Sequence, residues 1–511
     1  MPLKPIPLGK PIPPSPHAIS CSLPTMRSII GYEEKDPEIL QTLETGYPRF
    51  VTHPILSKLR DHFFPFRDLA GKSVWFTADL AAAREMAHVV DGHRLTEVKE
   101  LPGGVGVVRH PRDPELDRRA RRYLQSTGRI ISSRRAVDLL VAEGVMEKPF
   151  EEELIEEESF ARKTITETMG KIHGGVPAEN ILLAANGMNA FFETFNVLSR
   201  KQAGEGRFRW IQLGWLYTDT MTILNDFEQA PGPGKVERFY DVLGTDELLA
   251  FIKEHAGEIA GLVTECPTNP LLQTGDLESI AKAVHEAGGL MILDPTLASP
   301  YNIDVTPVAD VILNSLTKFA GNGGDVLMGS VVFPAGREKT LSCKEEIAAA
   351  LVSPYEKDVR RLAVEIGDYE NLMADANRSA AKVIEWLLKR PEVARVYWTG
   401  QSRCAEHYAR FRRPTGGVGA VFSIALKKNM RPFYDALRFP KGPSFGMQNS
   451  LVCPFMYLAH YDLVSSKEGQ RFLLEKGIPF SLLRFSIGRE PVEELIEALE
   501  EAFDLAAKEI S

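Results

Sequence analysis

The 511-residue sequence lacks three features that would assign it to whole classes of protein. Its five cysteines are scattered without a CxxC pair, which argues against a disulfide framework or a metal site such as zinc and favours a reducing compartment. No apolar run approaches the roughly 20 residues of a membrane span. The net charge is −9, which gives no general reason to expect nucleic acid. We therefore expect no nucleic-acid, membrane or metal partner, and a cytoplasmic location.

The N-terminus also lacks the apolar core of a signal peptide. It begins MPLKPIPLGKPIPPSPHA, a proline-rich stretch that predicts an extended arm, mobile unless it docks on something. SVWFTADLAAAREMAHVV (residues 73–90) predicts a strand and an amphipathic helix, and GGVGVVRH predicts another strand. We treat residues 1–115 as an N-terminal extension of uncertain fold. The acidic run EEELIEEE predicts a solvated helix.

The middle of the chain alternates short apolar runs with helix-like segments. From about residue 180 the apolar runs read ILLAAN, RWIQLGW, IAGLVTE, LMILD and VILNS. Strands buried on both faces and separated by helices predict an α/β domain with a mostly parallel sheet between helices. We assign residues 116–365 to this large domain. Residues 366–511, which end in a strongly amphipathic helix, are expected to form a smaller C-terminal α+β domain.

Polar residues follow these apolar runs, and ligands of open parallel sheets bind at the carboxyl ends of the strands. Gly187 follows the first run, Asp294 ends a later one, and Ser315, Thr317 and Lys318 follow the last. Each residue alone has a structural explanation, such as a tight turn or a helix cap. Together they bring a possible anion site, a carboxylate, two hydroxyls and a lysine to one edge of the sheet.

The order of these segments resembles the Cys/Met metabolism (trans-sulfuration) family of pyridoxal 5′-phosphate (PLP) enzymes. That family carries the segments SGMxA, YGGT, ESPxNP, DNTxxSP, SxTKxxxGHSD, SLGxxxS and RxSxGxE. Here the corresponding segments are NGMNA, YTDT, ECPTNP, DPTLASP, SLTKFAGNGGD, SFGMQNS and RFSIGRE. The N-terminal region most resembles the extension of fungal-type cystathionine γ-synthases. The resemblance implies the PLP-dependent transferase fold type I, PLP as cofactor, and a homodimer or homotetramer.

The resemblance also implies a role for each matching residue. Lys318 would hold PLP covalently and move protons, Asp294 would pair with the ring nitrogen, and Tyr217 would stack on the ring at the catalytic centre. The other implied positions are Gly187, Met188, Ser315 and Thr317 for the phosphate, Thr296 and Asn269 along the ring, and Arg484 with Ser450 for the substrate carboxylate.

Some segments depart from the family pattern. A Tyr-x-Arg segment that reaches the neighbouring subunit's phosphate has no direct match, and YLQSTGRIISSRR offers Tyr123 with Arg129, or alternatively Arg134. Asn186 and Asn189 replace smaller residues and are expected to add polar bulk at the phosphate. The lysine and its ring partner remain, so we expect PLP chemistry to be retained.

The leading hypothesis is a γ-replacement enzyme of the cystathionine γ-synthase type, which joins an O-acylated homoserine to cysteine in methionine biosynthesis. Three alternatives stay open: an O-acylhomoserine sulfhydrylase, a β- or γ-lyase acting on cystathionine or methionine, and a catalytically silent homologue that binds a partner. The sequence does not distinguish acetyl, succinyl and phosphate as the leaving group.

Overall fold

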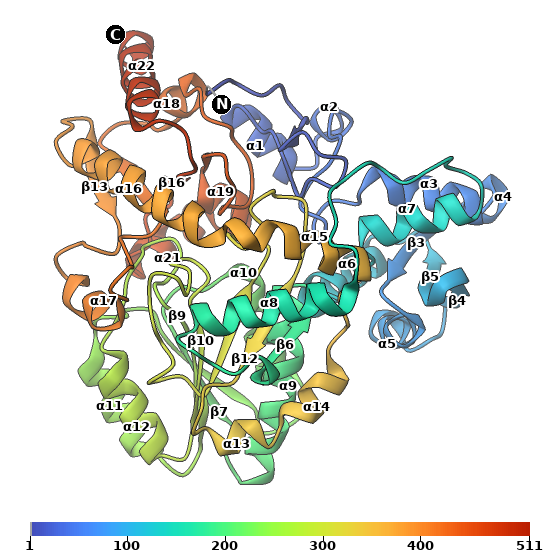
Figure 1. The fold of residues 1–511 in the computed structure, drawn as a ribbon, viewed down its shortest axis with the longest axis horizontal. Helices are drawn as coiled ribbons and strands as arrows, with labels where there is room; N and C mark the ends of the chain where they lie inside the picture. Colours follow the sequence, from blue (N-terminus) through green and yellow to red (C-terminus); the bar gives the residue numbers. More distant parts are fainter. Residues whose placement is uncertain (1–2, 511) are drawn as a thin grey trace.

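A seven-stranded sheet forms the centre of the large domain (Figure 1). The computed structural model describes residues 3–510. The sheet order is β6-β12-β11-β10-β9-β7-β8, in which β11 to β8 run parallel and β12 is antiparallel to both of its neighbours. The mostly parallel sheet expected from the sequence is confirmed. Its strands are β6 (Ile181–Ala184), β7 (Arg209–Leu213), β8 (Lys235–Phe239), β9 (Ile259–Glu265), β10 (Leu290–Asp294), β11 (Val311–Ser315) and β12 (Gly329–Val332).

Helices cover both faces of this sheet. They are α8 (Glu158–Ile172), η2 (Ala178–Asn180), α9 (Gly187–Gly204), α10 (Thr218–Gln229), α11 (Thr245–Glu254), α12 (Leu277–Glu286), α13 (Glu338–Leu341) and α14 (Lys344–Ala350). Met291 and Leu293 of β10 join a core with α8 and α12, whereas Leu290 and Ile292 join a second core with α9 and α10. Because side chains alternate along a strand, a continuous apolar run suits a sheet that is covered on both faces. Within residues 3–510, no helix is both long and apolar enough to cross a membrane.

The C-terminal part builds an antiparallel sheet of its own, in the order β13-β14-β16-β15. Its elements are α15 (Glu356–Glu365), η3 (Ile366–Asp368), α16 (Tyr369–Leu387), β13 (Val393–Tyr397), α17 (Ala405–Phe411), β14 (Val421–Leu426), α18 (Arg431–Ala436), β15 (Leu451–Cys453), α19 (Phe455–Ala459), α20 (Tyr461–Val464), α21 (Lys467–Glu475), β16 (Leu482–Ser486) and α22 (Val492–Ile510). Val383 of α16 and Leu495 of α22 share a buried core with Phe422 and Phe485 of the sheet. The helix and strands expected after residue 365, and the final amphipathic helix, are confirmed.

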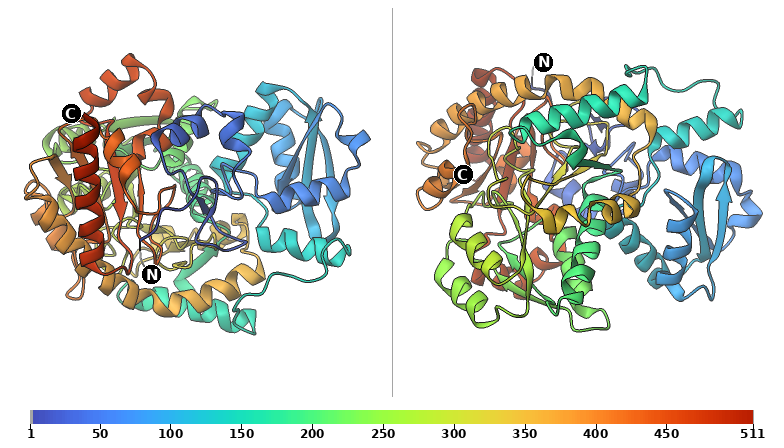
Figure 2. Two further views of the ribbon diagram at one scale, coloured as in Figure 1. Left: turned by 90° about the horizontal axis from the view of Figure 1, so that it is seen from above. Right: turned by 60° about the horizontal axis from the view of Figure 1, so that its bottom comes forward.

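A separate lobe lies beside the large domain, on the side opposite α22 (Figure 2). It contains α3 (Pro54–Phe63), α4 (Phe66–Leu69), β3 (Lys72–Thr77), α5 (Leu80–Asp91), β4 (Glu97–Leu101), η1 (Pro102–Gly104), β5 (Val105–Pro111), α6 (Pro114–Thr127) and α7 (Ser133–Ala142). The antiparallel sheet β3-β5-β4 packs through Val107 on α3 and α7, and through Val108 on α5 and α6. The strands and helix expected between residues 73 and 111 are confirmed.

The proline-rich arm docks on the rest of the chain. The arm contributes β1 (Pro11–Ile12), and the chain directly after it forms β2 (Ser20–Cys21), which pairs with β1, and then α1 (Met26–Glu33) and α2 (Pro37–Leu40). The N–H of Ile19 donates to the carbonyl of Gly324 at 3.0 Å, and the N–H of Leu23 donates to the carbonyl of Lys441 at 2.8 Å. At Gly324 (φ +70°) an added Cβ would lie only 2.9 Å from Pro13 of the arm. The glycines after Lys318 therefore admit the arm close to the site.

The acidic run is not the solvated helix that the sequence predicts. Residues 151–157 are not helical, and α8 begins only at Glu158. The carboxylate of Glu152 forms an ion pair with the buried guanidinium of Arg134 at 2.7 Å. The N–H of Ile155 donates to the carbonyl of Arg360 at 3.2 Å. These contacts with α7 and α15 hold the segment in a non-helical conformation, although its run of glutamates predicted a solvated helix.

Candidate active site

One cavity of about 1490 Å³ opens at the carboxyl ends of the parallel strands. The large domain contributes Gly187, Met188, Tyr217, Asn269, Asp294, Thr296, Ser315 and Lys318. Ser444 and Arg484 reach it from the C-terminal domain, and Tyr47 and Arg49 from the segment that follows the arm. The structure thus brings together most residues that the sequence placed at this sheet edge, as expected for an open α/β sheet.

Lys318 follows β11 and is buried in this cavity. Its Nζ donates a hydrogen bond to the hydroxyl of Ser444 at 2.7 Å and lies 4.8 Å from the ring centroid of Tyr47. Burial, followed by the nearby charges of Arg484 and Arg49, lowers the pKa of the Lys318 amine well below its usual range. An uncharged amine is the nucleophilic form, so the site prepares this lysine for covalent chemistry.

Two carboxyl groups, Asp294 and Glu265, end neighbouring strands and pair in register. Asp294 accepts a hydrogen bond from the N–H of Thr296 at 2.8 Å, and burial raises its pKa to about 6. Burial, and then the charge of Asp294, raises the pKa of Glu265 well above its usual range. Among residues 3–510, no cationic side chain forms an ion pair with Asp294. A cationic group of a ligand would complete that pair.

The start of α9 comes very close to the end of β11. A Cβ added at Gly187 would lie 3.0 Å from the Cβ of Ser315, so a side chain there would crowd this strand end. The first N–H groups of a helix have no partner within the helix and attract anions. Gly187, Met188 and Ser315 therefore form a small cradle that suits a phosphate.

The asparagines beside this cradle do not add polar bulk to it, contrary to the expectation from the sequence. Asn186 caps α9 by accepting from the N–H of Asn189 at 3.0 Å, and its amide donates to the carbonyl of Gly128 at 2.7 Å. The amide of Asn189 donates to the carbonyl of Thr127 at 3.1 Å. Both side chains tie α9 to the end of α6, and neither lines the cavity.

Arg484 of β16 presents its guanidinium to the same cavity. Nη1 donates to the side-chain oxygen of Asn269 at 3.2 Å, and Nη2 donates to the carbonyl of Ser444 at 3.1 Å. The group packs on the rings of Phe445 and Phe455, whose centroids lie 5.0 and 4.6 Å away. These contacts fix the plane of the guanidinium, which then suits a carboxylate.

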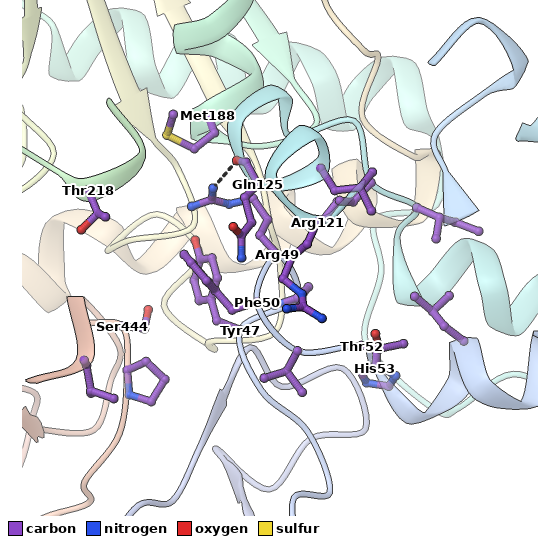
Figure 3. A pocket seen from close by; sticks show the side chains of 18 of the residues that line it. Tyr47, Arg49, Phe50, Thr52, His53, Arg121, Gln125, Met188, Thr218 and Ser444 are labelled. Atoms are coloured by element: carbon purple, nitrogen blue, oxygen red, sulfur yellow. Dashed lines mark hydrogen bonds between the residues drawn. The ribbon is translucent and has the colours of Figure 1, made fainter. Parts of the chain in front are cut away.

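The segment after the arm inserts two residues that the sequence analysis did not assign (Figure 3). Arg49 is buried, and it donates to the hydroxyl of Tyr217 at 2.6 Å and to the carbonyl of Gln125 at 2.6 Å. It also forms an ion pair with the buried carboxylate of Asp219. Tyr47 lies beside it and faces Lys318. The N-terminal extension is therefore part of the cavity wall.

Four predicted site residues lie outside the cavity lining: Ser450, Thr317, Tyr123 and Arg129. The Ser450 hydroxyl donates to the carboxylate of Glu490 at 2.7 Å and accepts from the N–H of Gly488 at 2.9 Å. The Thr317 hydroxyl accepts from the N–H of Met328 at 3.0 Å, between β11 and β12. Both hydroxyls satisfy buried structural groups, and their assignment to substrate and phosphate stays a prediction.

Tyr123 and Arg129 are also engaged elsewhere in their own chain. The hydroxyl of Tyr123 donates to the carbonyl of Ala82 at 3.1 Å. Arg129 forms ion pairs with Glu193 at 2.8 Å and with Glu85 at 2.7 Å. These bonds join α6 to α5 within the lobe and join the lobe to α9, and neither residue lines the cavity. Arg134, the other arginine considered, is held by Glu152 and two aspartates.

Four residues line the cavity but were not assigned to the site from the sequence, and each has a feature that points to it: Ser444, Glu265, Tyr47 and Arg49. Ser444 opens the same SFGMQNS segment from which Ser450 was chosen, and it adopts a left-handed φ of +87°, a strain that is common at functional sites. Glu265 ends a strand next to the strand of Asp294. Tyr47 and Arg49 have the Tyr-x-Arg spacing that was sought near residue 123.

Comparisons with known proteins agree with this fold and site. The family model described as "Cys/Met metabolism PLP-dependent enzyme" matches residues 158–504. The chain therefore belongs to the Cys/Met metabolism family of PLP-dependent enzymes.

Two curated relatives match along almost their whole length. The L-2-amino-4-chloropent-4-enoate dechlorinase/desaturase of Streptantibioticus cattleyicolor is 32% identical, with 97% of this chain and 98% of that protein covered. The cystathionine γ-synthase of Neurospora crassa is 25% identical, with 99% of each chain covered. Among solved structures, the cystathionine γ-synthase of Xanthomonas oryzae pv. oryzae has a TM-score of 0.59 and 24% identity over 68% of this chain and 86% of that one, which supports the fold.

The residues of the cavity fit the cofactor of this family. The buried Lys318 amine, with its lowered pKa, suits the aldehyde of the cofactor. The Asp294 carboxylate, which pairs with no cation of the described chain, suits the ring nitrogen, and the helix N-terminus beside the Ser315 hydroxyl suits the phosphate. The chain is a PLP-dependent enzyme, and the silent-homologue alternative is set aside.

Proposed function

We propose that this enzyme removes a leaving group from Cγ of an L-α-amino acid. The observation that carries the proposal is the position of Lys318, whose buried amine with a lowered pKa shares one cavity with Arg484 and Asp294. When bound, PLP supplies an electron sink for charge that develops on the substrate.

Each side chain that lines the cavity has its own role in the proposed reaction. Arg484 binds the α-carboxylate of the substrate, because its fixed guanidinium plane matches the two oxygens. Lys318 then takes protons from Cα and Cβ and returns them later in the reaction. Ser444, at 2.7 Å, orients the Lys318 amine between these transfers. Asp294 would keep the nitrogen of the cofactor ring protonated, and Tyr217 would lie along that ring.

Replacement of the leaving group by a thiol, as in a cystathionine γ-synthase, is the first candidate. The cavity of about 1490 Å³ must also hold the cofactor, but it extends from Lys318 as far as Trp75 of the lobe, and this extent supports room for a second substrate. Lys35 and Arg121 line its outer part, and cations there suit the carboxylate of an incoming cysteine. The substrates would be an O-acylated homoserine and cysteine. A sulfhydrylase, which uses sulfide instead of cysteine, is a variant of this reaction.

Elimination without an acceptor is the second candidate. It is favoured by the 32% identity with the dechlorinase/desaturase, which extends over 97% of this chain. In L-2-amino-4-chloropent-4-enoate the chlorine is on C4, which is Cγ of the amino acid. The same proton transfers by Lys318 would then expel chloride and leave an unsaturated amino acid. A β- or γ-lyase acting on cystathionine or methionine would also need no acceptor.

A product assay separates the candidates. The purified enzyme is incubated with O-acetyl-, O-succinyl- or O-phosphohomoserine or with L-2-amino-4-chloropent-4-enoate, each with and without cysteine or sulfide. Cystathionine formed only with cysteine supports replacement, and homocysteine formed from sulfide supports the sulfhydrylase. Chloride or 2-oxobutyrate released without a thiol supports elimination. If none of these compounds loses its γ substituent, the proposal is wrong.

A further inference from the structure

The loop that follows Lys318 begins with a strained residue. We call residues 319–325, FAGNGGD, the lysine loop. Phe319 has a left-handed φ of +58°, a conformation that is unfavourable for a bulky side chain and persists only where the surroundings enforce it. At this end, the N–H of Phe319 donates to the carbonyl of Gly446 at 2.8 Å. The shape of the lysine loop therefore depends on how its other end is held.

Asp325 ends the lysine loop, and Arg134 of α7 holds it from the lobe. Nη1 of Arg134 donates to the main-chain carbonyl of Asp325 at 2.8 Å, and Nη2 donates to the carboxylate of Asp325 at 3.2 Å. Arg361 of α15 lies 3.4 Å from the same carboxylate. Because one guanidinium bonds both the backbone and the side chain of Asp325, it fixes this residue in position and in orientation.

Arg134 is itself held in one position. Its side chain is only 1% exposed, and burial of an unpaired guanidinium is strongly unfavourable. Glu152 at 2.7 Å and Asp358 at 2.9 Å complete its set of partners. Asp358 belongs to α15, which packs against α7 and α8 (Figure 1). Arg134 is thus enclosed between the lobe and α15.

We propose that the lobe positions the lysine loop, and with it Lys318, through Arg134 as a positioning residue. Arg134 does not line the cavity, so it acts on the reaction only through Asp325 and the lysine loop. The family model begins at residue 158, so α7 and its arginine precede the part of the chain that this model matches. The inference rests on the proposed use of Lys318 as the catalytic amine.

The charges around Asp325 decide which variants can test this role. Burial opposes the charge of Asp325, but Arg134 and Arg361 outweigh this effect and lower the pKa of the carboxyl group. Asp325 is therefore an ionised partner of Arg134. Complete removal of Arg134 would leave Glu152, Asp325 and Asp358 without this cation, which endangers folding. Milder changes give the better test.

Asp325→Asn keeps the shape of the side chain and removes its charge, which weakens the link to Arg134. Amide hydrogen exchange in residues 319–325 should become about tenfold faster, because the lysine loop opens more easily. The dissociation constant of PLP should rise about tenfold and kcat should fall about 10- to 100-fold, because the Lys318 amine loses its fixed position. KM should change little, since Arg484 is untouched.

Asp310→Asn is the matched control. Asp310 is buried to a similar extent, but it precedes β11, whereas Lys318 follows this strand. Its carboxylate accepts from the N–H of Met291 at 2.7 Å. Both variants should lower the urea concentration at the midpoint of unfolding, but only Asp325→Asn should change loop exchange and PLP binding. Equal changes in the two variants would mean that Asp325 only stabilises the fold, and no change in Asp325→Asn would equally overturn the proposal.

Arg134→Lys tests the contribution of the lobe. It keeps the positive charge, but an ammonium group lacks the planar set of donors that bonds the carbonyl and the carboxylate of Asp325 together. This variant should fold and should weaken PLP binding about tenfold, as Asp325→Asn does. If both residues act through one contact, the double variant should bind PLP about as weakly as the weaker single variant.

Two results would contradict the role of the lobe: unchanged exchange of the lysine loop in Arg134→Lys, or losses in the double variant that multiply to about 100-fold. Hydrogen exchange and the PLP titration need no amino-acid substrate. They therefore test the positioning of Lys318 even if none of the candidate substrates reacts, and failure of the proposed reaction is recognised separately in the product assay.

Discussion

The hydroxyl of Ser444 lies 2.7 Å from the amine of Lys318, while Ser450, further along the same loop, bonds the buried carboxylate of Glu490 at 2.7 Å. One loop thus supplies a serine to the catalytic cavity and another to the core of the C-terminal domain. The division follows from the backbone, because Ser444 adopts a left-handed φ of +87° and turns its side chain towards Lys318.

Substitution of these two serines should therefore give opposite results. Ser444→Ala should lower kcat about tenfold, the worth of one hydrogen bond, with little change in the free energy of unfolding. Ser450→Ala should lower the free energy of unfolding by about 1–3 kcal/mol, because Glu490 loses a buried donor, with KM unchanged. Steady-state kinetics and urea unfolding of both variants measure this. Each serves as the control for the other, and a reversed pattern would contradict the assignment.

Lys318→Ala should abolish turnover, with a loss of about 10³-fold or more, while the far-ultraviolet circular dichroism stays unchanged. The physical reason is that one amine both holds the cofactor and moves the protons. Reduction of the cofactor-loaded enzyme with borohydride, followed by peptide mapping, should place the label on Lys318. Lys441 is an internal control, because it is also buried but bonds the carbonyls of Pro24 and Asp435 outside the cavity. A label at Lys441, or retained activity in Lys318→Ala, would disprove the attachment site.

The sequence predicted the sheet and its carboxyl edge well, and for a physical reason. A strand buried on both faces must be apolar throughout, so the runs before Asp294 and Lys318 stand out without any knowledge of contacts. The arm could not be placed in this way. Its docking depends on single contacts with distant residues, such as Ile19 with Gly324. The spacing of apolar residues along the sequence does not reveal such contacts.

The individual hydroxyls were equally hard to place from the sequence. Thr317 and Ser315 belong to one segment, yet the Thr317 hydroxyl bonds Met328 beside β12 and Ser315 lines the cavity. Strand β11 ends at Ser315, so the alternation of side chains along a strand does not place Thr317. Strand β8 was also missed, since KVERF carries three charged residues and only two apolar ones, and the strand pairs only at the sheet edge.

The raised pKa of Asp294 predicts how stability depends on pH in the cofactor-free protein. Its value is about 6 in the folded protein, against an ordinary value of 3.8. Below pH 3.8 the group is protonated in both states and costs nothing. The cost of the buried charge grows between pH 3.8 and 6 and is complete above pH 6. A difference of about two units corresponds to about 3 kcal/mol.

Asp294→Asn should therefore stabilise the cofactor-free protein by up to about 3 kcal/mol at pH 8 and have little effect at pH 4. The same change should lower turnover about 100-fold or more, because the cofactor ring loses the partner of its nitrogen. Urea unfolding at both pH values and steady-state assays measure the two effects. A variant less stable than the unchanged protein at pH 8 would show that Asp294 has a stabilising partner within the chain.

Arg484 should discriminate substrates by their α-carboxylate. Its guanidinium is held by Asn269, the Ser444 carbonyl and two aromatic rings. The two parallel N–H donors of this guanidinium, here called the fork, are therefore already oriented when a substrate carboxylate binds. Arg484→Gln should lower kcat/KM about 100-fold or more, and Arg484→Lys should lower it less, because the charge remains but the fork is lost.

The sharpest test of Arg484 compares an amino-acid ligand with the corresponding amine that lacks the carboxylate. Both are titrated into the cofactor-loaded enzyme while the visible absorption is followed. Arg484→Gln should weaken binding of the amino acid and leave binding of the amine nearly unchanged, since only the amino acid uses the fork. Arg395→Gln, on β13 of the same sheet and stacked on Tyr397, is the matched control and should alter neither. Equal weakening of both ligands by Arg484→Gln would mean that the arginine supports the cavity wall rather than the substrate.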